Sequence, residues 1–183
     1  MNYAAIKKND IANGPGVRVS LFVSGCRHKC KNCFNSEAWD FNYGNVFSKE
    51  VEDEILSACR HDYIEGLSLL GGEPFEKENR EALINLVSRF KEKYPHKSIW
   101  CYTGFVLDEE LLKEKSEATM KLLSYIDVIV DGRYIEKLKS LSLLFRGSSN
   151  QRIIDVKKTL AEGKVVLLQG NWERTIGSGN IYE

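Results

Sequence analysis

Short apolar segments alternate with amphipathic helical patterns along most of this chain, and this alternation constrains its fold more than any other feature. Apolar and β-branched runs predict five strands, at residues 17–23, 67–70, 98–102, 127–130 and 165–168. Helical spacing predicts the intervening helices, from the capping residue Ser48 to Cys59, at residues 83–94, as one or two segments at 107–126, and around 155–161. We therefore expect an α/β fold with a mostly parallel open sheet, because these units are too few to close a barrel. A partial barrel and a doubly wound sheet both fit this pattern.

Glycine-containing turns follow three of the predicted strands. They are Gly71-Gly72-Glu73-Pro74, Thr103-Gly104 and Asp131-Gly132. The carboxyl ends of parallel strands meet at one edge of a sheet, where the ligand sites of α/β proteins gather. Consecutive glycines also allow a ligand to approach the backbone closely, although such a turn often needs glycine for its conformation alone. This edge is therefore the expected location of a site.

Size and charge limit the classes of protein that this chain can represent. With 183 residues and 43% apolar content, we expect one domain over residues 1–183, with a loosely ordered tail at 170–183. Lys plus Arg equals Asp plus Glu at 26 each, so no overall field attracts nucleic acid or an anionic membrane. No run of about 18 apolar residues and no signal peptide is present, which predicts a cytoplasmic protein.

Three of the five cysteines lie within eight residues, as Cys26, Cys30 and Cys33. This grouping favours metal binding in a reducing compartment over a disulfide framework. Cys59 falls on a predicted helix, where we expect a small buried core residue, and Cys101 falls inside a predicted strand. Three thiolates on one loop can surround one soft-metal centre, and a four-iron cluster held in this way keeps one iron open for a ligand.

The three cysteines alone also fit a structural zinc knuckle that is completed by His28 or by a distant histidine. The glycine turn at residues 71–74 favours the open cluster, since it is expected to face the same cavity as the cysteine loop. His28 itself is expected to be a solvated loop residue.

The cysteine spacing and the later Gly-Gly-Glu turn together resemble the radical S-adenosylmethionine superfamily. The resemblance implies a partial (β/α) barrel, a [4Fe-4S] cluster and S-adenosyl-L-methionine as cofactors. It also implies that Cys26, Cys30 and Cys33 bind the cluster and that the rest of the site binds the nucleotide. Gly71, Gly72 and Glu73 would lie at the methionine amino group of the nucleotide, and Asn32 and Phe34 at its adenosyl part. Thr103 and Asp131 are at predicted strand ends near the cavity, and the alternative role for these two residues is to cap helices.

A narrower resemblance extends over almost the whole chain. The chain resembles the glycyl-radical activases, and among these it resembles the family that serves the anaerobic ribonucleoside-triphosphate reductase. This resemblance is carried by Asn13-Gly14-Pro15-Gly16, Phe22-Val23-Ser24-Gly25-Cys26, Trp100 with Tyr102-Thr103-Gly104, Val130-Asp131-Gly132-Arg133-Tyr134 and Arg146-Gly147-Ser148-Ser149-Asn150-Gln151. The resemblance implies that the large reductase subunit is the partner and that a flavodoxin or ferredoxin donates the electron. Pyruvate formate-lyase, another glycyl-radical enzyme or a small molecule remain alternative targets.

Overall fold

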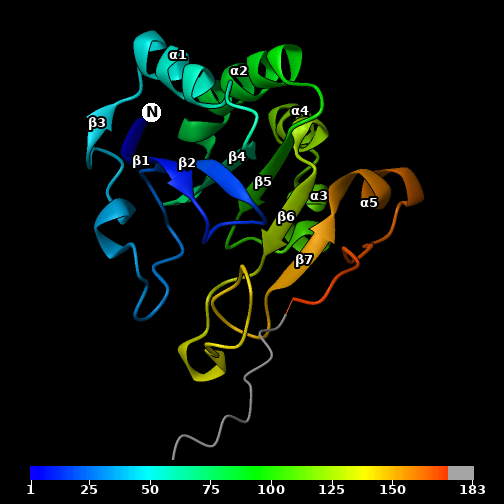
Figure 1. Ribbon diagram of the computed structural model, residues 1–183. Coiled ribbons are helices and arrows are strands. Elements are labelled where there is room, and N and C mark those ends of the chain that lie inside the picture. The colour runs from blue at the N-terminus through cyan, green and yellow to red at the C-terminus, as the bar shows by residue number, and fades with distance from the viewer. Residues whose placement is uncertain (173–183) are drawn as a thin grey trace, which may run out of the picture.

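Four parallel strands form the centre of a seven-stranded sheet in the computed structural model, which describes residues 1–172 (Figure 1). The strands are β1 (Asn2–Asp10), β2 (Val17–Val23), β3 (Asn45–Val46), β4 (Ile64–Gly71), β5 (Ser98–Tyr102), β6 (Val128–Asp131) and β7 (Arg152–Asp155). Their order across the sheet is β3-β1-β2-β4-β5-β6-β7. Strands β2, β4, β5 and β6 are mutually parallel, whereas β1, β3 and β7 pair antiparallel with their neighbours. The α/β class and the mostly parallel open sheet are thus confirmed.

Helices connect the parallel strands as the sequence pattern predicted. The longer ones are α1 (Lys49–Ala58), α2 (Lys77–Lys93), α4 (Glu117–Tyr125) and α5 (Val156–Glu162), and the short ones are η1 (Ser36–Trp39), η2 (Leu107–Leu111), α3 (Leu112–Glu114) and η3 (Glu136–Leu138). Ser48 begins α1 by accepting a hydrogen bond from the Val51 amide, and Ser116 begins α4 in the same way. The region 107–126, predicted as one or two helical segments, contains three consecutive helical pieces.

The prediction for the last strand was wrong. Residues 165–168 are not a strand of the sheet but a half-exposed segment beside β7, joined to it by an isolated bridge between Ile154 and Leu167. The true final strand, β7, precedes α5 and runs antiparallel to β6. The amino-terminal strand β1 was not predicted, because its residues are mostly half-buried or exposed and its sequence is polar.

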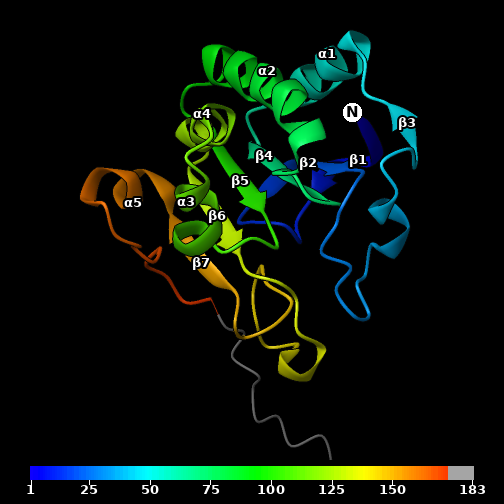
Figure 2. The same cartoon turned by 180° about the vertical axis from the view of Figure 1, so that it is seen from behind.

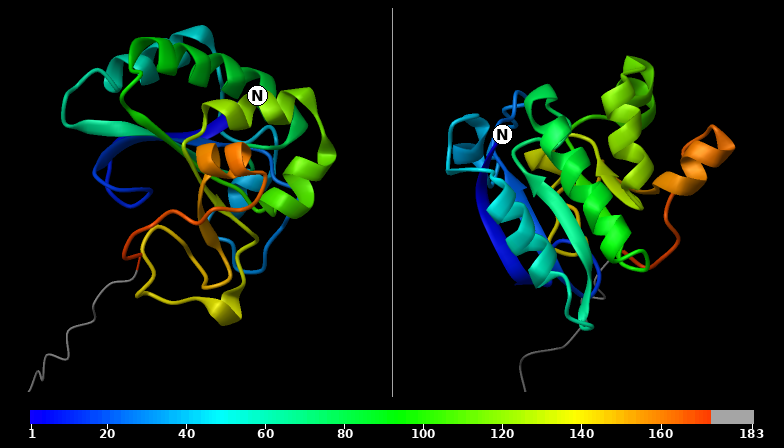
Figure 3. Two further views of the ribbon diagram at one scale, coloured as in Figure 1. Left: turned by 90° about the vertical axis from the view of Figure 1, so that its right-hand side faces the viewer. Right: turned by 90° about the horizontal axis from the view of Figure 1, so that it is seen from above.

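The two faces of the sheet are covered by different kinds of structure (Figures 2 and 3). The main core joins α1, α2 and α4 to alternate residues of the central strands. It includes Cys59, which is fully buried as expected, and Cys101, which is also fully buried. A smaller cluster on the opposite face contains Trp100, and Phe145 and Trp172 pack against it from connecting segments. The larger helices therefore pack against one face, and loops cover the other.

A fully buried arginine closes the amino-terminal end of the central strands. The Arg18 guanidinium donates to the Ser68 hydroxyl at 2.8 Å, to the Leu67 carbonyl at 3.0 Å and to the Ser98 carbonyl at 2.9 Å. It also lies over the Trp100 ring at 5.8 Å. A side chain on Gly14, in the turn between β1 and β2, would collide with Arg18, which explains the glycine there. Arg18 thus holds β2, β4 and β5 together where they begin.

The opposite, carboxyl end of these strands carries the sequence motifs. Strand β2 leads into the cysteine loop, β4 into the Gly-Gly-Glu turn, β5 into Thr103-Gly104 and β6 into Gly132. The parallel register places all four connections at one edge, as the strand order predicted. No helix within residues 1–172 is both long and apolar enough to cross a membrane. The expectation of a loosely ordered tail falls, beyond Trp172, outside the described residues.

Candidate functional site

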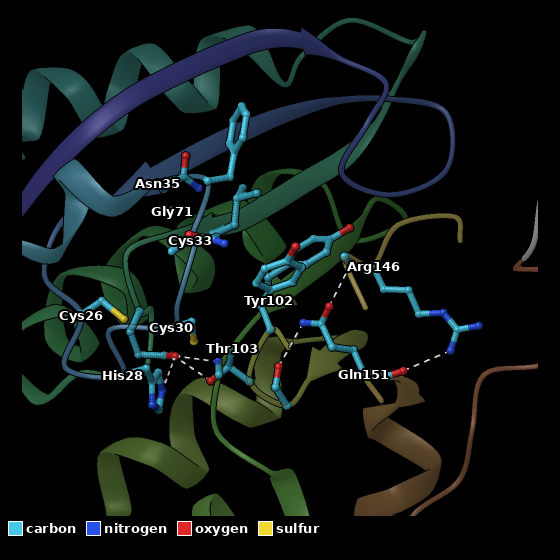
Figure 4. A pocket seen from close by; sticks show the side chains of 18 of the residues that line it. Cys26, His28, Cys30, Cys33, Asn35, Gly71, Tyr102, Thr103, Arg146 and Gln151 are labelled. Carbon is cyan, nitrogen blue, oxygen red and sulfur yellow. Dashed lines mark hydrogen bonds and ion pairs between the residues drawn. The ribbon is translucent and has the colours of Figure 1, made fainter. Parts of the chain in front are cut away.

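A cavity of about 530 Å³ lies at the carboxyl edge of the parallel strands (Figure 4). The predicted site residues that line it are Cys26, Cys30, Asn32, Cys33, Phe34, Gly71, Gly72, Glu73 and Thr103. Residues from the segment between β6 and β7 form the other wall, among them Tyr134, Leu141, Arg146 and Gln151. The structure therefore brings the two principal motifs into one cavity, and it adds a wall that the sequence motifs did not assign.

The cysteine loop presents three free thiols to this cavity. Cys26 is buried, while Cys30 and Cys33 are half-buried. Two residues between them, Lys29 and Asn32, adopt left-handed backbone conformations with φ of 49° and 58°, which turn the chain tightly enough to bring all three cysteines to one side. Burial raises the pKa of the Cys26 thiol to about 11 and also raises that of Cys30.

Backbone hydrogen bonds join the cysteine loop to the Gly-Gly-Glu turn. The Gly72 amide donates to the Val23 carbonyl at 2.7 Å, and the Glu73 amide donates to the Gly25 carbonyl at 2.8 Å. A β-carbon on Gly72 would lie 2.6 Å from the Gly25 carbonyl oxygen, so any side chain there would push the two motifs apart. Glycine at this position is required by the close contact of two backbones.

Glu73 is fully buried, and its carboxylate is surrounded by hydrogen-bond donors. Oε1 accepts from the Thr103 hydroxyl at 2.8 Å and from the Phe75 amide at 2.9 Å. Oε2 accepts from the Gly104 amide at 2.8 Å and lies 3.0 Å from His28 Nε2. The Glu73 carbonyl in turn accepts from the Asn79 side chain. Through these bonds, Glu73 holds the turn after β5 and the cysteine loop against the Gly-Gly-Glu turn.

His28 is not the solvated residue that we expected. Its side chain is only 7% exposed, and Arg133 Nε donates to Nδ1 at 3.1 Å while Nε2 contacts Glu73. These partners occupy both ring nitrogens and leave neither for a metal, which argues against the zinc knuckle completed by His28. No local pattern predicts this contact, because Arg133 is 105 residues away along the chain.

The remaining predicted residues have different environments. Thr103 lines the cavity, but its hydroxyl is engaged with Glu73 and with the Phe105 amide. Phe34 lines the mouth and is 96% exposed. Asp131 is not among the lining residues; its carboxylate accepts from the Leu107 amide at 2.8 Å and pairs with Arg152 at 2.5 Å. The structure therefore does not bring Asp131 together with the other candidates.

The wall that sequence motifs left unassigned is organised by Gln151. Its side-chain oxygen accepts from the Gly147 amide at 2.8 Å and its side-chain nitrogen donates to the Gly132 carbonyl at 3.0 Å. Tyr102, at the end of β5, also lines the cavity, and its buried hydroxyl has no hydrogen-bond partner among the described residues. The sequence signals for this wall were the Arg-Gly-Ser-Ser-Asn-Gln segment and the Val130–Tyr134 segment, which contains Gly132 and Tyr134.

The donor set of the cavity fits an iron–sulfur cluster with one open iron. Three thiols from one loop line it, while Cys59 and Cys101 are fully buried in the core on the helix-covered face and cannot supply a fourth. Soft thiolates are the ligands that iron–sulfur clusters take in proteins. Within residues 1–172, no three His, Cys, Asp or Glu side chains converge on a point as they would around a single ion.

Comparisons with known proteins agree with this geometry. Residues 12–154 match the family described as a 4Fe-4S single cluster domain. The chain is 43% identical over 153 residues to the anaerobic ribonucleoside-triphosphate reductase-activating protein of Enterobacteria phage T4, a match that covers 84% of this chain and 93% of the relative. The proteins of the same name from Escherichia coli K12 and Vibrio cholerae are 42% and 43% identical and are covered over 96% and 97% of their lengths.

Proposed function

The chain belongs to the family of anaerobic ribonucleoside-triphosphate reductase-activating proteins with a 4Fe-4S domain, and from this premise we propose how it acts. It generates a glycyl radical on the reductase by reductive cleavage of S-adenosyl-L-methionine. The open sheet is in this proposal a shortened radical S-adenosylmethionine barrel with its site at the carboxyl edge. The observation that carries the proposal is the meeting of Cys26, Cys30 and Cys33 with the Gly-Gly-Glu turn in one cavity.

The cofactors supply the redox chemistry, and the protein supplies binding and orientation. A bound [4Fe-4S] cluster, reduced by a flavodoxin or ferredoxin, would supply the one electron needed to cleave S-adenosylmethionine to methionine and 5′-deoxyadenosine, with the hydrogen atom taken from a glycine of the reductase. Cys26, Cys30 and Cys33 would hold the cluster. Their thiols must lose protons to bind iron, so cluster binding must overcome the raised pKa of buried Cys26.

The glycine turn is proposed to bind the methionine end of the nucleotide through its backbone. The Glu73 carboxylate already faces three protein donors and His28, so it supports the turn from below rather than receiving the amino group itself. This leaves the backbone of Gly71 and Gly72, which line the cavity, as the groups that face the ligand. Asn32 and Phe34, on the cysteine loop, are proposed to contact the adenosyl part.

The substrate in this proposal is a loop of the large reductase subunit, so the cavity must be reachable by a folded partner. Two large apolar side chains at its lining are strongly exposed, Phe34 at 96% and Leu141 at 82%. They come from opposite walls, the cysteine loop and the segment between β6 and β7. Docking of the partner would cover them and exclude water from the reacting atoms.

The proposal is tested by anaerobic mixing of the iron-loaded protein, reductant, S-adenosylmethionine and the large reductase subunit. We expect 5′-deoxyadenosine and a glycine-centred doublet in electron paramagnetic resonance. The controls are the triple variant Cys26→Ser, Cys30→Ser, Cys33→Ser and a reductase whose radical-forming glycine is alanine, and both should abolish the doublet. Iron-loaded protein that forms no 5′-deoxyadenosine would refute the chemistry. Formation of 5′-deoxyadenosine with a doublet only on pyruvate formate-lyase would refute the partner.

A further inference from the structure

A chain of side-chain contacts links η2 and the segment after β6 to the cysteine loop and the Gly-Gly-Glu turn. It begins at Glu110, which accepts from Arg133 Nη2 at 3.0 Å. Arg133 Nε then donates to His28 Nδ1 at 3.1 Å, and His28 Nε2 lies 3.0 Å from Glu73 Oε2. His28 is thus the only member on the cysteine loop, and its ring lies between the segment that follows β6 and the turn that follows β4.

The hydrogen-bond partners fix which ring nitrogen of His28 carries the proton. An arginine Nε–H is a donor and never an acceptor, so Nδ1 must accept and carries no proton. The carboxylate of Glu73 accepts only, so Nε2 must be the protonated nitrogen that donates to it. The same neutral ring therefore satisfies both neighbours, and its orientation is specified from two sides.

Packing fixes the ring as well. The edge of Phe105 meets it at 4.4 Å between centroids and at 70° between planes. A β-carbon on Gly104 would lie 2.4 Å from the ring, so the absence of a side chain there makes the space that the imidazole fills. Gly104 also donates its amide to Glu73. The strand end after β5 is therefore shaped around His28.

We propose that His28 is a positioning residue, which holds the cysteine loop against Glu73 and so sets where Cys26 and Cys30 lie relative to the Gly-Gly-Glu turn. This inference rests on the proposed function, because the loop matters as the cluster-binding element. His28 also lines the cavity, but protein groups already engage both of its ring nitrogens, so its proposed role is to hold the loop and not to bind a ligand. It acts indirectly, because its bonds to Glu73 and Arg133 fix the loop that carries the cysteines, and groups beyond the ligands themselves affect metal sites strongly.

A second tether holds the beginning of the same loop and must be separated from His28. The Arg27 amide donates to Glu76 at 2.8 Å, and the Arg27 guanidinium pairs with Glu76 and Glu78. The later part of the loop contains the Cys33 amide, which donates to the Cys30 carbonyl at 3.1 Å. Exchange of the Cys33 amide hydrogen therefore reports on the part of the loop that His28 controls, and that of Arg27 serves as an internal reference.

Two substitutions divide the contacts of His28. In His28→Gln, the longer amide can still donate to Glu73 but no longer offers Nδ1 to Arg133. In His28→Asn, the shorter amide can accept from Arg133 but cannot reach Glu73. Arg133→Gln removes the outer contact at an exposed residue and does not threaten the fold. Lys31→Ala, an exposed change within the same loop, is the matched control.

The first measurement is hydrogen exchange of the metal-free protein, which does not depend on the proposed reaction. We expect His28→Asn to speed exchange of the Cys33 amide by about tenfold, the effect of one lost hydrogen bond to a charged group. His28→Gln should stay closer to wild type, and the Arg27 amide should change little. Circular dichroism must show that each variant is folded. If His28→Asn is unfolded, Arg133→Gln replaces it as the test, with a smaller expected increase in the exchange rate of the Cys33 amide.

The second measurement is the reduced cluster signal in electron paramagnetic resonance, with and without S-adenosylmethionine. His28→Asn is expected to lower the iron content per chain and to shift this signal, whereas His28→Gln restores both. The inference is overturned if exchange at Cys33 in folded His28→Asn and Arg133→Gln stays within twofold of Lys31→Ala. A wild-type protein that forms no cluster would instead refute the proposed function, while the exchange data would still decide on the role of His28.

Discussion

A buried charged side chain lies at each end of strands β2, β4 and β5, and the two are satisfied differently. At the amino-terminal end, Arg18 bonds to residues within the strands themselves, Leu67, Ser68 and Ser98. At the carboxyl end, the bonds of Glu73 reach mainly into the connections between strands, to the turn after β5 and to the cysteine loop. Arg18 therefore fixes strands to one another, whereas Glu73 fixes the connections between strands.

The difference separates stability from function along the same strands. Arg18 is fully buried, and this removal from water lowers its pKa to about 10. Neutral hydroxyl and carbonyl acceptors offset that desolvation, and the result is a closed end. At the other end, the buried Glu73 carboxylate is also surrounded by hydrogen-bond partners, but a cavity remains beside it. These bonds support the backbone that lines the cavity. Loops that must bind a ligand are thus anchored to the rigid sheet from below.

The largest expected effect on stability comes from Arg18→Ala. The change removes a fully buried side chain and leaves several buried acceptors without their donor, so the free energy of unfolding should fall by about 3–5 kcal/mol. Urea denaturation of the metal-free protein measures it. The exposed Arg60→Ala is the matched control and should cost less than about 0.5 kcal/mol. A loss below about 1 kcal/mol for Arg18→Ala would remove the basis of the comparison.

Glu73→Gln is expected to have the next largest effect on stability, with a larger one on the site. In this variant the side-chain NH2 group of glutamine faces hydrogen-bond donors that the carboxylate had accepted from. The lost hydrogen bonds should lower the free energy of unfolding by about 1–3 kcal/mol. In contrast to Arg18→Ala, the variant should also speed amide exchange in the cysteine loop, because the contact to His28 changes. Equal exchange in the two variants, measured under conditions where both are folded, would show that the ends do not differ in this way.

The fold could be predicted where strands are buried on both faces. Strands β2 and β5 occupy the predicted residues 17–23 and 98–102, because central parallel strands are continuous apolar runs. The strands towards the two sides of the sheet carry no such signal. β1 is mostly half-buried or exposed, and the short edge strand β7 has a weaker apolar pattern than the segment 165–168, which lies half-exposed beside it. Pairing at an edge depends on long-range contacts that local pattern does not reveal.

The candidate site was predicted where residues act through local motifs. The cysteine loop and the turn at 71–74 meet in one cavity because parallel strands bring their ends together. His28 and Arg133 escaped prediction, since only the folded chain brings them into contact. Asp131 was predicted from its place at a strand end, yet its side chain turns to Arg152 and to the start of η2. Sequence thus locates an edge of the sheet but not the direction of each side chain.

Acid should weaken the amino-terminal end through Asp127, with a smaller effect than the substitutions above. Burial alone would raise the pKa of Asp127, but hydrogen bonds from Lys91, the Ile99 amide and Lys157 outweigh it and lower the pKa below its usual value. A lowered carboxylate pKa contributes stability above the unfolded value of about 3.9, and this is lost as pH falls through the folded value. Asp127→Asn should cost about 1–2 kcal/mol at pH 7 and much less at pH 3. A cost that is independent of pH in urea titrations would contradict this.

Tyr102→Phe should change stability least, and it tests whether the carboxyl end keeps a polar group for a ligand. The Tyr102 hydroxyl is buried at the cavity and has no partner among the described residues, so its removal should alter the free energy of unfolding by less than about 0.5 kcal/mol. Tyr94→Phe is the control, because that hydroxyl donates to the Leu56 carbonyl at 2.7 Å and its loss should cost about 1 kcal/mol. If the hydroxyl serves a ligand, Tyr102→Phe should weaken equilibrium binding of S-adenosylmethionine or of the reductase several-fold, whereas Tyr94→Phe leaves both unchanged. The opposite result would be a Tyr102→Phe protein that loses as much stability as Tyr94→Phe and binds S-adenosylmethionine and the reductase normally. The Tyr102 hydroxyl would then have a structural role, like the groups around Arg18.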